Sequence, residues 1–140
     1  MQRVLYLSES HIEEADAQLV VSQIVANAQI NNARLGITGA LIYTGEHFAQ
    51  VLEGSPETIQ MLMARIVADF RHQNVVVVDQ SPIDGRRFPE WSLAYQGQSQ
   101  FVSRHVTRLM NMTSQSEKRR ASAWLTDLAH EFSLTETPSG

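Results

Sequence analysis

The stretch GALIYTGEHFAQVLEG, residues 39–54, decides the fold of this chain. It contains two apolar runs separated by Thr44, Gly45 and Glu46, which is typical of two antiparallel strands joined by a tight turn. Glycine in such a turn relieves the backbone. We therefore predict a β-hairpin here, and the other elements can be placed around its two strands.

The residues before the hairpin predict one strand and one helix. The alternation of a strand that carries polar groups on one face is present at Val4, Leu5, Tyr6, Leu7 and Ser8. From Asp16 to about Asn32, apolar residues such as Val20, Ile24 and Ala28 recur at helical spacing, and Gly36 follows as a stop. The first helix is therefore predicted to end near the two asparagines.

After the hairpin, Ser55 and Pro56 are a typical helix cap and first turn. The predicted second helix has an apolar stripe formed by Ile59, Leu62, Met63, Ile66, Val67 and Phe70. The β-branched run 75–78 predicts a fourth strand. A fifth strand is predicted around Trp91, Leu93 and Tyr95, which alternation places on one side.

The order β-α-β-β-α-β with one added strand predicts an α+β, ferredoxin-like fold, in which two helices cover one face of a five-stranded sheet. Two C-terminal helices, 103–112 and 114–132, would cover the other face. A Ser114 and Glu117 capping box opens the second, whose buried side is predicted to be Ala121, Trp124, Leu125, Leu128 and Phe132. We expect one domain over 1–98, a helical extension over 99–133 that packs on the sheet, and a flexible tail over 134–140.

Composition excludes several classes of function. The chain has 140 residues and no cysteine, which removes disulfides, thiolate nucleophiles and covalent cysteinyl photochemistry. Its net charge of -4 argues against nucleic acid and anionic membranes as partners. Because no apolar run approaches the roughly 20 residues of a membrane span, we expect a cytoplasmic protein.

Polar side chains occupy predicted core positions on two strands. Gln50 shares a strand face with Phe48 and Leu52, and Tyr6 is expected to point toward the same helix layer. Burying an unpaired amide costs about 1–3 kcal/mol, so Gln50 should have a partner or a ligand. Backbone groups or water would satisfy such residues equally well, and periodicity does not name a ligand.

Four segments together resemble BLUF domains, which are flavin-binding blue-light sensors. They are Tyr6 with Ser8, NNARLGITGALIY at 31–43, FAQVLEG at 48–54 and RRFPEWS at 86–92, and the match covers roughly the first 100 residues. The resemblance implies a non-covalently bound flavin, FAD or else FMN or riboflavin, with its ring between the two helices. That position agrees with the fold predicted above.

The resemblance also implies a role for individual residues. Tyr6 would be photoactive, and Gln50 would lie between it and the flavin N5 and O4 edge, while Asn32 would bind the O4 and N3 side. Ser8, Trp91 and Leu93 are the implied signal relay. The remaining implied contacts are Asn31 and Arg65 on the polar edge or ribityl chain, Asp69, Arg71 and His72 near the phosphate end, and Ile24, Ile37, Phe48, Leu52 and Ile66 around the ring, each equally compatible with plain core.

By this analogy, Tyr6 gives an electron and a proton to the excited flavin through Gln50, the pair recombines, and a rotated or tautomerised Gln50 persists until it relaxes in darkness. Leu93 departs from the family, which usually has methionine two residues after the tryptophan. Leucine cannot accept a hydrogen bond, whereas its volume is close to that of methionine. We therefore expect flavin binding to be retained and signal transfer to depend on shape.

About 45 residues follow the fifth strand, too few for an effector enzyme, so the output is expected to pass to an unidentified downstream protein. The fifth strand and the two C-terminal helices would be the surface for that protein or for a homo-oligomer. One alternative is a small ferredoxin-like enzyme that uses His47, His72 or His105 as an acid or base. Another is a flavin-free interaction module. No histidine pair has metal-ligand spacing, so no metal is expected.

Overall fold

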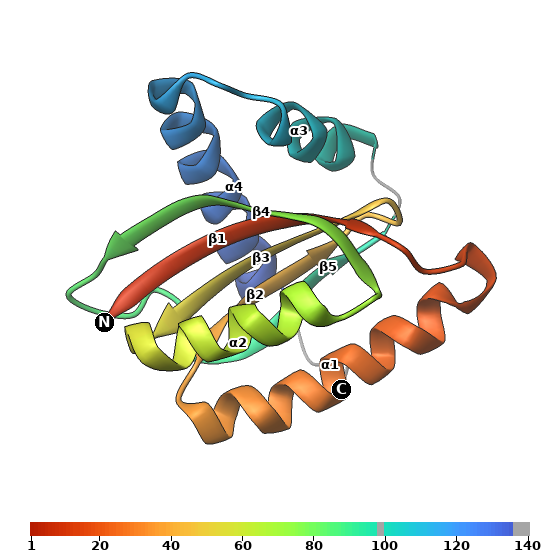
Figure 1. Cartoon of the computed structure of the whole chain (residues 1–140), viewed down its shortest axis with the longest axis horizontal. Coiled ribbons are helices and arrows are strands. Elements are labelled where there is room, and N and C mark those ends of the chain that lie inside the picture. Colours follow the sequence, from red (N-terminus) through yellow and green to blue (C-terminus); the bar gives the residue numbers. More distant parts are fainter. Residues whose placement is uncertain (98–99, 136–140) are drawn as a thin grey trace.

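The computed structural model describes residues 1–97 and 100–135 (Figure 1). Its strands are β1 (Gln2–Ser10), β2 (Thr38–Tyr43), β3 (His47–Gly54), β4 (His72–Pro82) and β5 (Trp91–Gln96). Its helices are the short η1 (Glu14–Asp16), α1 (Ala17–Leu35), α2 (Pro56–Ala68), α3 (Gln100–Met110) and α4 (Gln115–Thr135).

The five strands form one sheet in the order β4-β1-β3-β2-β5, in which only β5 runs parallel to its neighbour. Helices α1 and α2 cover one face, and α3 and α4 lie on the other (Figure 1). The predicted α+β, ferredoxin-like architecture is confirmed. Each face has its own apolar core, and the core on the α1 and α2 side contains Val4, Tyr6, Val21, Ile37, Leu41, Tyr43, Phe48, Leu52, Ile59 and Trp91.

The predicted turn and cap chemistry is present. Gly45 adopts a φ of 93° in the hairpin turn, a conformation that side chains disfavour. The Ser55 side chain accepts a hydrogen bond from the Thr58 N–H and caps α2. These local signals fix the turn between β2 and β3 and the start of α2.

Two helix predictions need correction. Helix α1 continues to Leu35 and ends where Gly36 adopts a left-handed φ of 69°, so Asn31 and Asn32 lie inside its last turns rather than at its end. On α2 the buried stripe is narrower than predicted. Val67 is 63% exposed, and Phe70, which follows the end of the helix, is 82% exposed.

The prediction that Trp91, Leu93 and Tyr95 share one side was wrong for Tyr95. The pairing of β2 with β5 shifts register between Leu41 and Ile42, so that Leu41 pairs with Leu93 and Ile42 with Tyr95. One extra residue on β5 reverses the alternation. Tyr95 therefore packs against the core of the opposite face, where its ring stacks on Phe132 of α4.

The C-terminal helices cover the second face as predicted, with Leu125 fully buried and Ala121, Trp124, Leu128 and Phe132 packed beside it. Helix α3 begins earlier than predicted, at Gln100, and α4 extends to Thr135, so Leu134 belongs to a helix rather than to a tail. The predicted boundary at 98–99 and the tail residues 136–140 lie outside the described residues. The division of the chain into a domain and an extension stays a prediction.

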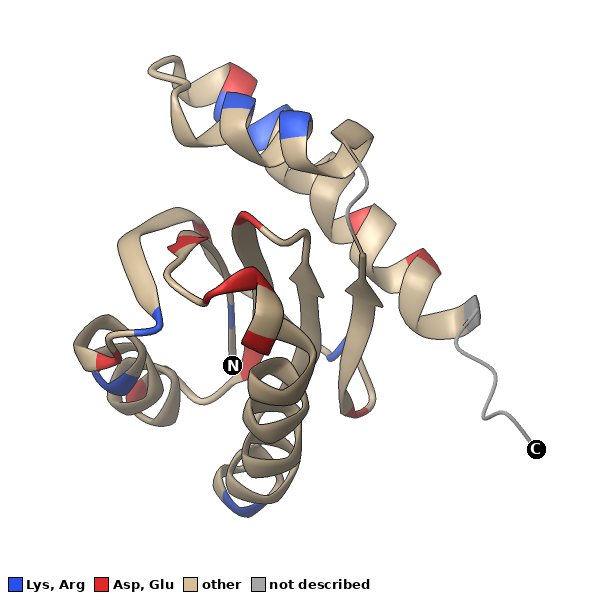
Figure 2. Ribbon diagram, turned by 90° about the vertical axis from the view of Figure 1, so that its right-hand side faces the viewer, with Lys and Arg blue, Asp and Glu red and all other residues tan. Residues whose placement is uncertain are grey.

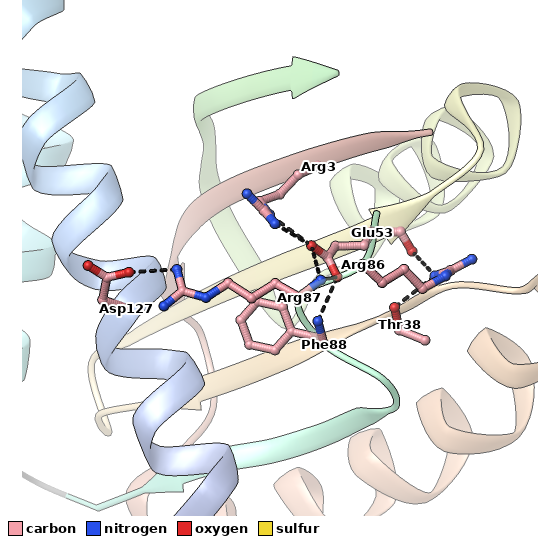
Figure 3. A network of polar contacts seen from close by, with 7 residues as sticks. All are labelled: Arg3, Thr38, Glu53, Arg86, Arg87, Phe88 and Asp127. Carbon is pink, nitrogen blue, oxygen red and sulfur yellow. Dashed lines mark hydrogen bonds and ion pairs between the residues drawn. The ribbon is translucent and has the colours of Figure 1, made fainter. Parts of the chain in front are cut away.

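A buried carboxylate connects β3 to the segment before β5 (Figure 3). Glu53 is fully buried and accepts hydrogen bonds from the Arg3 guanidinium and from the backbone N–H groups of Arg87 and Phe88. The Arg86 guanidinium donates to Thr38 Oγ1 and to the Glu53 carbonyl. We call these contacts the Glu53 network. It fixes the segment that leads directly into Trp91.

Candidate functional site

Tyr6 and Gln50 form the centre of the site. They lie directly opposite each other on the adjacent strands β1 and β3, and the Tyr6 hydroxyl donates a 2.5 Å hydrogen bond to Gln50 Oε1. Both side chains are buried. Burial, together with the negative charge of Asp69, raises the pKa of Tyr6 above its usual value, so the phenol stays protonated and acts as a donor.

A cavity of about 180 Å³ lies beside this pair, between the sheet and helices α1 and α2. Tyr6, Trp91 and every predicted cofactor residue except Ile37 and Leu52 line it; these are Ile24, Asn31, Asn32, Phe48, Gln50, Arg65, Ile66, Asp69, Arg71 and His72. Ile37 and Leu52 are fully buried in the core next to the cavity. Because Asn31 and Arg65 are exposed, the cavity reaches the surface.

Sequence reasoning missed four lining residues, namely Asn27, Ala28, Leu41 and Leu62. Asn27 and Ala28 each lie one helical turn before an asparagine that was identified, and Leu62 lies one turn before Ile66. Spacing of i to i+4 would therefore have found these three. Leu41 pairs with Gln50 across the hairpin, so the hairpin register was its signal.

The cavity wall contains a buried polar group without a partner. The Nε1 of Trp91 is buried and has no hydrogen-bond partner among the described residues. The side-chain amides of Asn32 and Gln50, which are 2% and 5% exposed, line the same cavity, and Gln50 Oε1 is already paired with the Tyr6 hydroxyl. Unpaired buried polar groups are costly, so an unpaired donor beside two amides indicates a ligand that carries polar groups.

His72 forms one side of the cavity next to Tyr6. Its Nδ1 shares a 2.8 Å hydrogen bond with Ser8 Oγ, and its ring packs against Phe48 with 4.5 Å between centroids. Burial lowers the pKa of His72, with a smaller opposing effect from Asp69, and favours the neutral ring. Ser8 therefore contacts the cavity residue His72 and does not line the cavity itself.

The charged end of the site lies after α2. Arg71 donates side-chain and backbone hydrogen bonds to Asp69, which hold the pKa of that carboxyl below its usual range. Arg65 is exposed and has no ion-pair partner among the described residues. A ligand phosphate would thus meet Arg65 as a free cation, but Arg71 as one already paired.

The two predicted relay residues on β5, Trp91 and Leu93, differ in their contact with the cavity. Trp91 is 7% exposed, and its indole lines the cavity. Leu93 packs against the same core without lining the cavity. Contact between the cavity and β5 is therefore made by Trp91.

The alternative acid-base histidines do not converge. His72 lies at the cavity, whereas His105 belongs to α3 on the opposite face and stacks on Trp124 with 4.1 Å between ring centroids. Among residues 1–97 and 100–135, no group of three or more His, Asp or Glu residues is arranged to hold a metal ion. A larger groove of about 1050 Å³ between η1, the hairpin turn and α3 contains none of the predicted site residues.

Within the described part of the chain, no helix has the length and apolar character needed to cross a membrane. Charge is distributed unevenly: residues 100–120 contain five of the 11 Lys and Arg but one of the 15 Asp and Glu. Figure 2 shows these basic residues on α3 and the start of α4, whereas acidic residues gather near η1. The surface opposite the cavity is thus locally basic on an acidic protein.

Comparison with known proteins gives consistent matches. A family model described as BLUF, sensors of blue-light using FAD, matches residues 1–94. Photoactivated adenylate cyclase subunit beta of Euglena gracilis is 35% identical over 94 residues, which are 66% of this chain and 11% of that protein. This chain spans about a tenth of the length of the curated relatives it matches.

Two solved structures are similar over most of their length. The BLUF protein BlrB in its dark state has a TM-score of 0.75 and 31% identity, with 93% of this chain and 95% of that chain covered. The ground state of BlsA has a TM-score of 0.71 and 25% identity, with 91% and 87% covered. Both the sheet and its helices thus have counterparts of known structure.

Proposed function

The chain belongs to the BLUF family of blue-light sensors that use flavin, and we propose that it detects light through the Tyr6–Gln50 pair and passes the signal to another protein. The observation that carries the proposal is the hydrogen bond from Tyr6 to Gln50 Oε1, which leaves the Gln50 Nε2 directed to the ligand cavity as a donor. A buried amide in this position has two hydrogen-bonding arrangements.

The residues present fit a flavin. The polar edge of the isoalloxazine ring has carbonyl acceptors and an N–H donor, which complement the side-chain amides of Asn32 and Gln50 on the cavity wall. Apolar side chains from both helices, Ile24 and Ile66, line the same cavity and suit a flat ring. When bound, the flavin supplies light absorption and a reversible electron acceptor.

We propose FAD as the flavin, with FMN or riboflavin as alternatives. A groove of about 650 Å³ begins at Asp69 and Arg71 and continues along Phe70 toward η1 and α1. It supports a cofactor with a long tail, because it shares those two residues with the cavity. Arg65 and the unpaired part of the Arg71 guanidinium would meet the phosphates.

Tyr6 donates to Gln50 Oε1, and we assign this arrangement to darkness, with the amide N–H of Gln50 left for the ligand. Rotation or tautomerisation of Gln50 would present a different group both to the ligand and to Tyr6. Tyr6 is suited to give up an electron together with its proton, because its raised pKa opposes loss of the proton alone. The state of one amide would thus record whether light was absorbed.

We propose that the chain has no enzymatic activity of its own and acts in the cytoplasm, alone or as a homo-oligomer. The α3 and α4 surface is suited to the downstream partner, because its local excess of positive charge would attract an acidic protein surface. Nucleic acid and membrane remain disfavoured by the overall charge of -4.

The test is the absorption spectrum of purified protein in darkness and after blue light, with Tyr6→Phe as the active-site variant. Tyr43→Phe is the matched control, because Tyr43 is a buried tyrosine of the same core that does not line the cavity. We expect a flavin spectrum that shifts reversibly to longer wavelength in the wild type and in Tyr43→Phe, but not in Tyr6→Phe. A shift that survives in Tyr6→Phe would contradict the proposal.

A further inference from the structure

The segment Arg86–Trp91 connects the ligand cavity to helix α4. At its end the indole of Trp91 forms part of the cavity wall. In its middle, Phe88 is 1% exposed and sets its ring edge-on against His130 of α4, with 5.6 Å between centroids. The same short segment therefore contacts the cavity and the helix on opposite faces of the sheet.

The segment is held against the sheet by the Glu53 network (Figure 3). The Glu53 carboxylate binds two successive backbone N–H groups, and the Arg86 guanidinium also donates to the carbonyl of Gly36, just after α1. Hydrogen bonds to charged groups are among the stronger contacts of a protein. These hydrogen bonds restrain the segment. A displacement of Trp91 would therefore be transmitted along it.

One contact of this segment is suited to change. The Arg87 guanidinium donates a 2.6 Å hydrogen bond to Asp127 of α4, and both side chains are partly exposed, at 35% and 62%. An exposed ion pair of this kind shifts an equilibrium by up to about fivefold. That is enough to alter a population without determining the fold, whereas the buried Phe88 contact is a fixed support.

We propose that the Arg87–Asp127 ion pair couples the cavity to α4, so that rearrangement at Trp91 changes how often the backbone hydrogen bonds of α4 open. Arg87 and Asp127 are positioning residues in this coupling, since neither lines the cavity. The coupling rests on the proposed light response and specifies how it reaches the C-terminal helices. It uses contacts before β5 rather than the side chains of β5 itself.

The test is hydrogen-deuterium exchange of α4 in darkness and in blue light, with the flavin spectrum recorded on the same samples. The variant is Asp127→Ala, and the matched control is Glu131→Ala, which removes an exposed acid one turn further along α4 that has no partner among the described residues. Alanine favours a helix, so both variants should fold. Arg87→Gln and the double variant Arg87→Gln with Asp127→Ala complete a double-mutant cycle, which isolates the coupling between the two residues.

We expect the light-induced change in α4 exchange to shrink by up to about fivefold in Asp127→Ala and in Arg87→Gln, with no further loss in the double variant. Flavin spectrum and recovery should match the wild type in all of them. If the spectrum shifts with light but α4 exchange responds equally in Asp127→Ala and Glu131→Ala, the coupling is refuted and the proposed function stands. A wild type without a light-induced spectral shift overturns both.

Discussion

Replacing Glu53 of β3 should destabilise the protein more than the loss of any one charge within the β4–β5 connection, residues 83–90. Glu53→Ala removes the acceptor of two backbone N–H groups, of which that of Phe88 is buried, and leaves Arg3 without its partner. Breaking a buried ion pair by removing one member costs about 3–5 kcal/mol. Because Arg3 is 21% exposed and regains some water, we expect a loss of about 3 kcal/mol in the free energy of unfolding.

The assay is urea unfolding, supported by the melting temperature, which should fall on the order of 10–15 °C. Glu53→Gln keeps one oxygen that can accept the backbone donors, and its loss in the free energy of unfolding should be smaller, about 1.5 kcal/mol. Glu90→Ala is the control from the same connection, since Glu90 is exposed and has no side-chain partner among the described residues. Equal stability of Glu53→Ala and Glu90→Ala would refute the assigned role of the carboxylate.

Three further outcomes are expected. Gly39→Ala should destabilise by more than 4 kcal/mol or prevent folding, because its Cβ would lie 1.8 Å from the Val51 carbonyl oxygen at a φ of 149°, whereas Gly85→Ala meets no atom within 4 Å and should be neutral in thermal unfolding. Ser55→Ala should cost about 1 kcal/mol in the same assay through loss of the α2 cap. Burial lowers the pKa of His72 below 6.5, so the folded state binds fewer protons than the unfolded state below that pH. The contribution of His72 to the free energy of unfolding should therefore be fully present above about pH 6.5 and should be lost as the pH drops. His72→Gln should reduce this loss, as measured by urea unfolding.

The central pair of the site could be predicted because strand alternation has only two outcomes per residue. Once β1 and β3 are adjacent, Tyr6 and Gln50 lie on the face that also carries Val4 and Phe48, and helices cover that face. Neither the cavity size nor the partner of each polar group follows from alternation. That the Trp91 indole N–H remains unpaired depends on side-chain positions that alternation does not fix.

Alternation failed where the backbone inserts one residue. Nothing in the sequence of β5 marks the shift opposite Leu41 and Ile42, so Tyr95 was assigned to the wrong face. Helical periodicity failed in another way, since it indicates the direction of a buried stripe but not its width. Val67 and Phe70 continue the apolar pattern of α2, yet both are exposed, and Phe70 lies beyond the last residue of the helix.

The same alternation explains why one strand can serve both the cavity and the opposite face. Gln50 and Glu53 are three residues apart on β3, so they point to opposite sides of the sheet. Gln50 meets Tyr6 at the cavity, while Glu53 fixes the segment whose Arg87 reaches α4. A carboxylate at the position of Glu53 would be costly without its donors, and the two backbone donors come from residues 34 and 35 places later in the chain. The cost of burying Glu53 therefore ties correct placement of the β4–β5 connection, which leads into Trp91, to the folding of β3.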